Sequence, residues 1–370
     1  MTNSLSIQPG GHTNPMPDPG ILLAAVPGLL GFVPEQSVVL VAFRDRRTVS
    51  ATMRHDLFLT KSGFPSAGMR ELFGTLGTLA ESYDAAGTVA VIIDDRYPPT
   101  DKRYRKVAEV AEKSFRKAGG LSAVFAMNKA ALGAEWHTIW RPPTEAACVL
   151  PFEGELPDTG TLSDPNASPT ALERAVNTGR RILSSRSEIA ALLEPEPHCA
   201  DEECRAQSPQ PTRHVPGRSD ARGLAFTLAT ISRFDGGDTH LSCEDLNGLA
   251  EALVSIHVRD ALLGLSLTGL RGTCEDFWRT LTKRLPAPAR AAAATLLGYL
   301  HYMAGEGAYA GIAFQTAHDA DPEYNLANLL DTALFNGMRP KELSGLAELA
   351  YDIAERLGAE LPPPVFAAAG

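Results

Sequence analysis

The sequence predicts an α/β domain, with three layers built on a mixed sheet, followed by an all-α, tetratricopeptide-like helical domain. Two observations predict this order. Short apolar segments rich in β-branched residues alternate with amphipathic helical segments in the first part of the chain, whereas the chain beyond Gly223 is rich in Ala and Leu and has helical periodicity. A charged stretch interrupted by Pro lies between the two parts, which is typical of an interdomain linker.

These patterns also set the expected boundaries. The first residues are rich in Gly, Pro, Asn and Ser without periodicity, which predicts a disordered tail. The full expected division is a disordered tail at 1–19, the α/β domain at 20–197, the linker at 198–222, the helical domain at 223–360 and a second tail at 361–370.

The α/β domain begins with a short helix that we expect to stop near Pro27. Residues 37–43 form a nearly continuous apolar segment, which is typical of a strand covered on both faces. Residues 48–57 alternate between apolar and polar side chains and predict the second strand of a hairpin. Ser66 then begins a helix with apolar side chains at every third or fourth position, and Gly87 ends it.

Residues 88–93 predict a second buried strand. We expect Thr100 to cap the next helix, which Gly119 and Gly120 close. Two strands at 121–127 and 134–140 complete the order β-β-α-β-α-β-β, which implies a mixed sheet with right-handed crossovers. A last helix is expected from Ser168-Pro169 to about residue 193.

The helical domain contains one recognisable internal pattern. Ser242 and Asp245 resemble a capping box, and later Pro and Gly residues divide the domain into about six or seven helices. The positions that match a tetratricopeptide repeat are Leu297, Gly298, Ala310, Phe314, Ala317 and Pro322, with His301 where an aromatic residue is expected.

This pattern predicts both buried and exposed positions. Ala310, Phe314 and Ala317 are expected between the two helices. The first helix of such a pair lines a concave groove, where tyrosines provide contact area and asparagine amides hold a peptide backbone. The residues predicted to bind a partner there are Tyr299, Tyr302, Asn325 and Asn328, with Thr295 beside them.

Composition excludes several classes of protein. Lys and Arg number 34 against 44 Asp and Glu, a net charge of −10, which disfavours a nucleic-acid partner and excludes a globally basic phosphate binder. The longest apolar segments are shorter than the roughly 18–20 residues of a membrane span, and the start of the chain has no secretory pattern. Five scattered cysteines are typical of cytoplasmic thiols, so we expect a cytoplasmic protein.

The segment from Leu22 to Pro34, followed by Ser37-Val38-Val39, resembles the opening of an actinobacterial family designated domain of unknown function 4192. The resemblance covers about residues 21–358 and implies architecture and taxonomic origin, but no activity. Further segments that carry it are Gly179-Arg180-Arg181, Ser185-Arg186-Ser187-Glu188, Val258-Arg259-Asp260, Gly305-Glu306-Gly307, Asp321-Pro322-Glu323-Tyr324 and Leu326-Ala327.

Two clusters invite a chemical interpretation. Asp94, Asp95 and Arg96 follow a buried strand directly, and ligands collect beyond the carboxyl ends of strands in open α/β sheets, so these residues are the candidate ligand site. The alternative is a plain turn in which the Asp side chains accept hydrogen bonds from local backbone amides.

The glycines of Gly28-Leu29-Leu30-Gly31 also raise the question of a phosphate loop. The segment lacks the Lys-Ser/Thr of such a loop and precedes a strand, which favours glycines that permit close packing.

The second cluster is in the predicted linker. His198, Cys199, Cys204 and His214 suggest zinc, but the Cys-x4-Cys spacing is loose and a second dipeptide pair is missing, so solvated thiols are favoured. We therefore expect no cofactor and no metal.

Three functional hypotheses remain at this point. The favoured one is a noncatalytic interaction or regulatory module that docks a protein partner through its helical domain, because no known catalytic constellation is present. The alternative is an enzyme of unrecognised class with its site near Asp94, Asp95 and Arg96. Association with nucleic acid is the least favoured, because of the net charge.

Overall fold

The computed structural model describes residues 16, 18–143, 148–199 and 218–365. The chain divides into two compact units, residues 1–188 and 189–370. Most of the predicted first tail and of the predicted linker lies outside the described residues. Helix α7 begins at Arg218, so the end of the range predicted as linker is helical.

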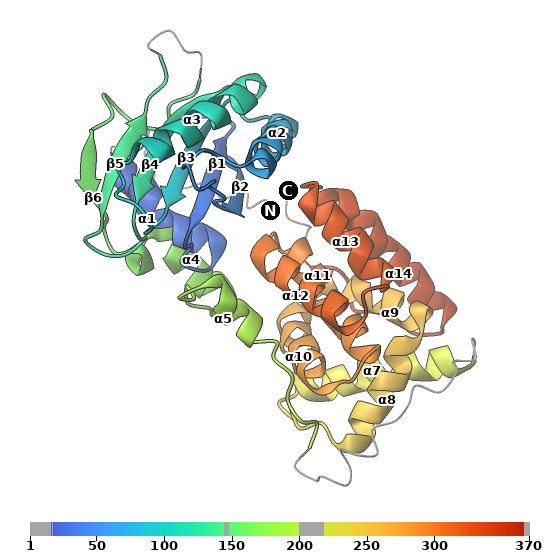
Figure 1. Cartoon of the computed structure of the whole chain (residues 1–370). Helices are drawn as coiled ribbons and strands as arrows, with labels where there is room; N and C mark the ends of the chain where they lie inside the picture. Colours follow the sequence, from blue (N-terminus) through green and yellow to red (C-terminus); the bar gives the residue numbers. More distant parts are fainter. Residues whose placement is uncertain (1–15, 17, 144–147, 200–217, 366–370) are drawn as a thin grey trace. The chain divides into compact units, whose positions relative to one another are not determined.

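The first unit contains a six-stranded mixed sheet with the strand order β2-β1-β3-β4-β5-β6 (Figure 1). Strands β3 and β4 run parallel, and every other neighbouring pair is antiparallel. The strands are β1 (Ser37–Phe43), β2 (Val49–Asp56), β3 (Gly87–Ile93), β4 (Leu121–Met127), β5 (Glu135–Trp140) and β6 (Thr159–Thr161).

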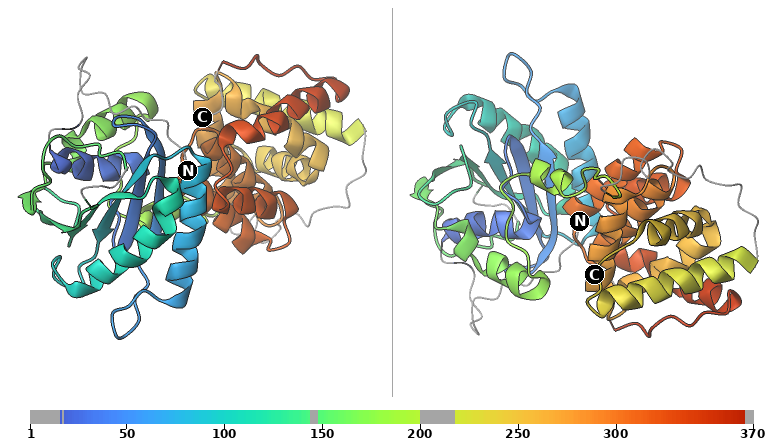
Figure 2. Two further views of the ribbon diagram at one scale, coloured as in Figure 1. Left: turned by 90° about the horizontal axis from the view of Figure 1, so that it is seen from above. Right: turned by 90° about the horizontal axis from the view of Figure 1, so that it is seen from below.

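Helices cover both faces of this sheet and make three layers (Figure 2). Alternate residues of the central strands point to opposite faces. Val39 and Val91 join the core under α1, whereas Leu40 and Ile92 join the core under α2 and α3. The helices of this unit are α1 (Pro19–Leu30), α2 (Ala67–Ser82), α3 (Lys102–Phe115) and α4 (Pro169–Thr178), and α5 (Arg186–Ala191) spans the division between the units.

The predicted element order of the α/β part is confirmed, with four local corrections. Helix α1 continues through Pro27 to Leu30, because its buried apolar side chains outweigh the one hydrogen bond that proline removes. Asp101, not Thr100, caps α3 with its side chain. The helix predicted over residues 168–193 is interrupted by Gly179, whose φ of 67° ends α4. The fourth correction is β6, which the sequence pattern did not indicate.

The described residues of both predicted tails make contacts with the rest of the chain. Met16 is 5% exposed, and its N–H donates to the carbonyl oxygen of Pro151 at 2.8 Å. At the other end, Leu361 is buried and the N–H of Val365 donates to Leu267 O at 2.8 Å. Short segments of both predicted tails therefore pack on their own units.

The second unit is helical, as predicted. Its α-helices within residues 218–365 are α7 (Arg218–Asp235), α8 (Cys243–Val254), α9 (Ile256–Leu262), α10 (Arg271–Arg284), α11 (Ala289–Met303), α12 (Gly307–Ala320), α13 (Asn325–Phe335) and α14 (Ser344–Arg356). No helix in the described part of the chain is both long and apolar enough to cross a membrane.

Two details predicted from the sequence of this unit are confirmed. Ser242 and Asp245 form a reciprocal capping box at the start of α8. Ala310, Phe314 and Ala317 are fully buried. A Cβ atom placed on Gly298 of α11 would lie 2.4 Å from the ring of Phe314 in α12, so the glycine allows the ring to pack directly on the neighbouring helix.

Two glycines of α2, in the first unit, allow a matched test of whether glycine is required where two segments pack closely. A Cβ on Gly77 would lie 2.3 Å from the backbone oxygen of Ser114, whereas a Cβ on Gly74 would meet open space. We expect Gly77→Ala to lower the free energy of unfolding by about 1–3 kcal/mol through overpacking. Gly74→Ala should raise it by roughly 0.5–1 kcal/mol, because Ala is the better helix former. Urea denaturation of both variants measures the difference, and destabilisation of equal size in both would contradict the close contact.

Candidate functional site

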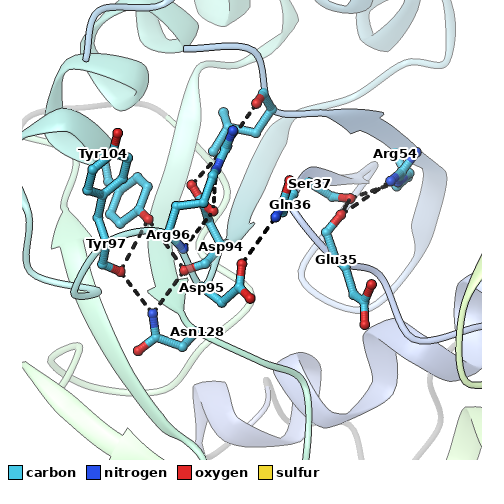
Figure 3. A network of polar contacts seen from close by, with 11 residues as sticks. Glu35, Gln36, Ser37, Arg54, Asp94, Asp95, Arg96, Tyr97, Tyr104 and Asn128 are labelled. Atoms are coloured by element: carbon cyan, nitrogen blue, oxygen red, sulfur yellow. Dashed lines mark hydrogen bonds and ion pairs between the residues drawn. The ribbon is translucent and has the colours of Figure 1, made fainter. Parts of the chain in front are cut away.

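The candidate ligand residues lie at one edge of the sheet (Figure 3). Ile93, the last residue of β3, pairs with Ser37 at the start of β1 and with Met127 at the end of the parallel strand β4. Ser37 also pairs with Asp56 at the end of β2. Four strands therefore bring terminal residues to this edge, and Asp94 directly follows β3.

Asp94 is buried and both of its carboxylate oxygens are engaged. Arg96 Nε donates to Asp94 Oδ1 at 2.7 Å, and Arg96 Nη2 donates to Oδ2 at 3.0 Å. Asp94 is 0% exposed, whereas the Arg96 side chain is 34% exposed. The hydrogen bonds to Asp94 raise the pKa of Arg96. This bidentate geometry is typical of a strong, charge-assisted ion pair.

The same guanidinium connects the loop to the neighbouring hairpin. Arg96 Nη2 also donates to the carbonyl oxygen of Leu57, just beyond β2, at 2.9 Å. The pair therefore joins the residues that follow β3 to the residues that follow β2. This contact favours a structural role for Asp94 and Arg96.

The backbone of this loop is held from the other side by Asn128, which follows β4. Its amide nitrogen donates to Asp94 O and to Tyr97 O, both at 2.9 Å. The hydroxyl of Tyr104 lies 3.4 Å from the same two carbonyl oxygens. Burial raises the pKa of Tyr104, so the hydroxyl keeps its proton and acts as a donor. Sequence analysis missed Asn128, although its place directly after a strand is the same signal that indicated Asp94.

Asp95 differs from its two neighbours. Its side chain is exposed, and its Oδ1 accepts a hydrogen bond from Gln36 Nε2 at 3.3 Å. Gln36 has a φ of 43°, and its carbonyl oxygen accepts from Leu57 N at 2.7 Å. The three predicted residues thus do not converge on one point: Asp94 is buried in an ion pair, and Asp95 faces solvent. A ligand role remains a prediction, and it is geometrically open to Asp95.

The residues predicted to bind a partner differ in their exposure to solvent. Tyr299 and Tyr302 are 1% and 0% exposed, and their hydroxyls donate to the carbonyl oxygens of Leu343 and Met338. The expectation that these tyrosines line an open groove is wrong, because the segment around η4 (Pro340–Leu343) covers this side of α11. Thr295 is also buried.

Asn325 and Asn328 are exposed, as a binding role requires. Asn328 donates to Pro322 O at 3.1 Å and so supports the turn before α13. Asn325 lines a different hollow of the helical unit, with a volume of about 240 Å³ between α9, α13 and α14. We call this hollow the α13–α14 groove. Its lining comprises Arg259, Asp260, Leu263, Asn325, Leu326, Leu329, Leu346, Leu349 and Ile353.

The α13–α14 groove exposes large apolar side chains. Leu329 is 68% exposed and Leu349 is 47% exposed. Sequence analysis missed both residues, because a leucine on the apolar side of a helix has the same pattern whether another helix covers it or not.

The linker residues are only partly described. His198 and Cys199 end the described segment before residue 200, whereas Cys204 and His214 lie outside the described residues. Cys243, the first residue of α8, lies close to His198 and Cys199.

Comparison with known protein families now identifies the family. A family model described as domain of unknown function (DUF4192) matches residues 19–341. The chain belongs to the DUF4192 family. No curated protein and no solved structure matched the chain.

The DUF4192 opening motif has a packing role in this structure. A Cβ on Gly28 would lie 2.3 Å from Thr170 Oγ1 and 2.6 Å from the backbone nitrogen of Ala171, so only glycine lets α1 meet the start of α4 this closely. Thr170 Oγ1 also donates to Ala25 O at 2.8 Å. This contact supports close packing, rather than phosphate binding, as the reason for the glycines.

Two further segments of the DUF4192 resemblance meet in the helical unit. Arg259 Nη1 donates to the hydroxyl oxygen of Tyr324 at 3.3 Å, and Arg259 also pairs with Asp260 at 2.6 Å. The Arg259 side chain is only 12% exposed. Burial raises the pKa of Tyr324, so the phenol remains neutral beside the guanidinium. Arg259 thus bridges α9 to the start of α13 and fixes one wall of the α13–α14 groove.

Proposed function

We propose that this DUF4192 protein is a noncatalytic interaction module that docks a protein partner through its helical unit. The partner segment is a basic amphipathic helix, and it binds in the α13–α14 groove. The exposure of Leu329 and Leu349 beside a hollow with polar side chains at its margin is the observation that carries this proposal. A helix laid in a groove buries such leucines against its own apolar positions at i, i+3, i+4 and i+7.

The charge of this region favours a basic partner. Residues 319–360, which contain α13 and α14, carry nine Asp and Glu but three Lys and Arg. Opposite charge on the partner raises the rate of encounter and disfavours acidic competitors. The same charge argues against nucleic acid, whose phosphates would be repelled.

The helix pair α11–α12 supplies the rigid support for this groove. Its tetratricopeptide-like character is part of the proposal, and the packing of Phe314 on Gly298 supports it. Tyr302 and Tyr299 donate to the segment that precedes α14 and so fix the position of that helix. In this arrangement the tyrosines act behind the binding surface, and the leucines of α13 and α14 form it.

A designed peptide tests the proposal before any natural partner is identified. The probe is a labelled helix of about five turns, with Leu at i, i+3, i+4 and i+7 and Lys at the remaining positions. We expect the full-length protein to bind it with an affinity that falls as salt rises. The variant Leu329→Ser/Leu349→Ser should bind at least about tenfold more weakly, because two apolar contacts are lost without any change in charge.

The controls separate binding in the α13–α14 groove from nonspecific binding of the peptide to the protein. Leu172→Ser removes a similarly exposed leucine (56% exposed) from α4 of the other unit and should leave peptide binding unchanged. A peptide of the same composition in scrambled order has the same charge but no apolar stripe and should bind weakly. Equal binding of the ordered peptide by the wild type and the double variant would refute the groove as the docking site.

A further inference from the structure

We propose that His198, Cys199 and Cys243 form a zinc-binding site in the helical unit. One imidazole nitrogen and two thiol sulfurs lie within 4.8 Å of one another. They come from two separate segments. His198 and Cys199 lie in the segment that follows α5, and Cys243 is the first residue of α8. Folding therefore brings together ligands that the local sequence spacing does not indicate.

The segment that carries His198 and Cys199 is fixed to the helices behind it. Glu196 N donates to Lys283 O at 2.8 Å, and the Glu196 carboxylate forms an ion pair with the Lys283 ammonium. Three residues earlier in the chain, Leu193 O accepts a hydrogen bond from Arg290 Nη2 at 3.0 Å. These contacts hold the approach to the site against α10 and α11, so the two ligands do not depend on a freely moving chain.

Cys243 is fixed from the other side. Ser242 N donates to Asp245 Oδ2 at 2.9 Å and Asp245 N donates to Ser242 Oγ at 3.1 Å, which anchors the start of α8. Arg233 Nη2 pairs with the same carboxylate at 2.9 Å. The first turn of a helix also carries partial positive charge, which stabilises a negatively charged thiolate ligand at Cys243.

The surrounding space accommodates an ion and a fourth ligand. The three residues line a cavity of about 740 Å³, together with His240 and Arg284. His240 is exposed and precedes Cys243 by three residues, a spacing within the usual range for two ligands of one zinc ion. Its imidazole supplies the fourth ligand, or a water molecule occupies that position.

The chemistry of the ligands selects the metal. Two sulfurs and one or two imidazoles are ligands for zinc, whereas magnesium and calcium require oxygen. Zn–S and Zn–N bonds of roughly 2.3 and 2.0 Å place tetrahedral ligand atoms about 3.5 Å apart. The ligand atoms, which lie within 4.8 Å of one another, therefore move closer by at most about 1.3 Å when zinc binds, which side-chain rotation can supply.

Metal analysis of the untagged, full-length chain tests the site, since a polyhistidine tag would itself bind zinc. After incubation with zinc sulfate and removal of excess metal, we expect about one zinc ion per chain. Cys199→Ser and Cys243→Ser should each retain little zinc. Cys148→Ser, which removes a partly buried thiol of the other unit, should retain the wild-type amount.

A second readout keeps the test independent of how well the variants fold. Cobalt added to the metal-free wild type should give a thiolate-to-cobalt absorption band, and zinc in equal amount should abolish it, whereas excess magnesium should not. The absence of that band in the wild type would overturn the proposal. So would full zinc retention by folded Cys243→Ser, or a mass two hydrogens lighter that assigns Cys199 and Cys243 to a disulfide.

Discussion

Replacing Arg96 with Leu should lower the free energy of unfolding of the first unit by about 3 kcal/mol, because it leaves the buried Asp94 carboxylate without its cationic partner. This value is the lower end of the range for breaking a buried pair, since a third of the Arg96 side chain is exposed and water screens the interaction there. The bond from Arg96 to Leu57 O is lost as well.

Tryptophan fluorescence can follow this unit selectively. Trp136 and Trp140 lie in β5, whereas the remaining tryptophan, Trp278, is in α10 and can be replaced by Phe in every protein compared. Urea denaturation then reports on the sheet. In this background, Asp95→Ala should change the free energy of unfolding by less than about 0.5 kcal/mol, because the side chain is exposed.

The double variant Asp94→Ala/Arg96→Leu makes the test specific to the pair. It removes both charges, so we expect it to cost less than the sum of the two single replacements. If Arg96→Leu is as harmless as Asp95→Ala, the ion pair does not hold this edge together. Asp94, Asp95 and Arg96 would then again be candidates for a shared ligand site.

Much of the fold could be predicted because its strands are unusually clear in the sequence. Ser37–Phe43 is a nearly continuous apolar segment, and the structure buries all seven of its residues. Pro27 misled the prediction, since the cost of one lost hydrogen bond is small beside a helix whose residues are almost all buried. Strand β6 has three residues, too few for any alternation to be visible.

The candidate sites could be predicted only in part. The position of Asp94 after β3 indicated the correct edge of the sheet, but not that a residue two positions later would engage its carboxylate. The groove in the helical unit was missed for a different reason. Helical periodicity identifies an apolar side of α13 or α14, but which of its leucines other helices cover depends on the packing of segments distant in sequence. Sequence analysis did not connect Cys243 with His198 and Cys199 for the same reason, because the chain brings them together from segments distant in sequence.

Tyr302→Ala should be severely destabilising, which reverses the expectation drawn from the repeat pattern. That pattern placed Tyr302 on an open surface, where truncation would weaken partner binding and spare the fold. The side chain is instead 0% exposed, and its ring packs edge-on to Phe314 at a centroid distance of 6.4 Å. Truncation of a buried aromatic ring leaves a cavity, so we expect a loss of about 3–5 kcal/mol in the free energy of unfolding.

Two further variants separate the contribution of the buried ring from that of the hydroxyl and of general surface substitution. Tyr302→Phe keeps the ring and removes the hydroxyl that donates to Met338 O, so it should cost about 1–2 kcal/mol, including the penalty for an unsatisfied carbonyl. Asn328→Ala, at an exposed position of α13, should cost less than about 1 kcal/mol. The measurement is urea denaturation followed by Trp278 fluorescence, with Trp136 and Trp140 replaced by Phe in every protein compared. Near-wild-type stability of Tyr302→Ala would return this tyrosine to the surface and restore the groove along α11, because only an uncovered α11 could lose the ring without forming a cavity.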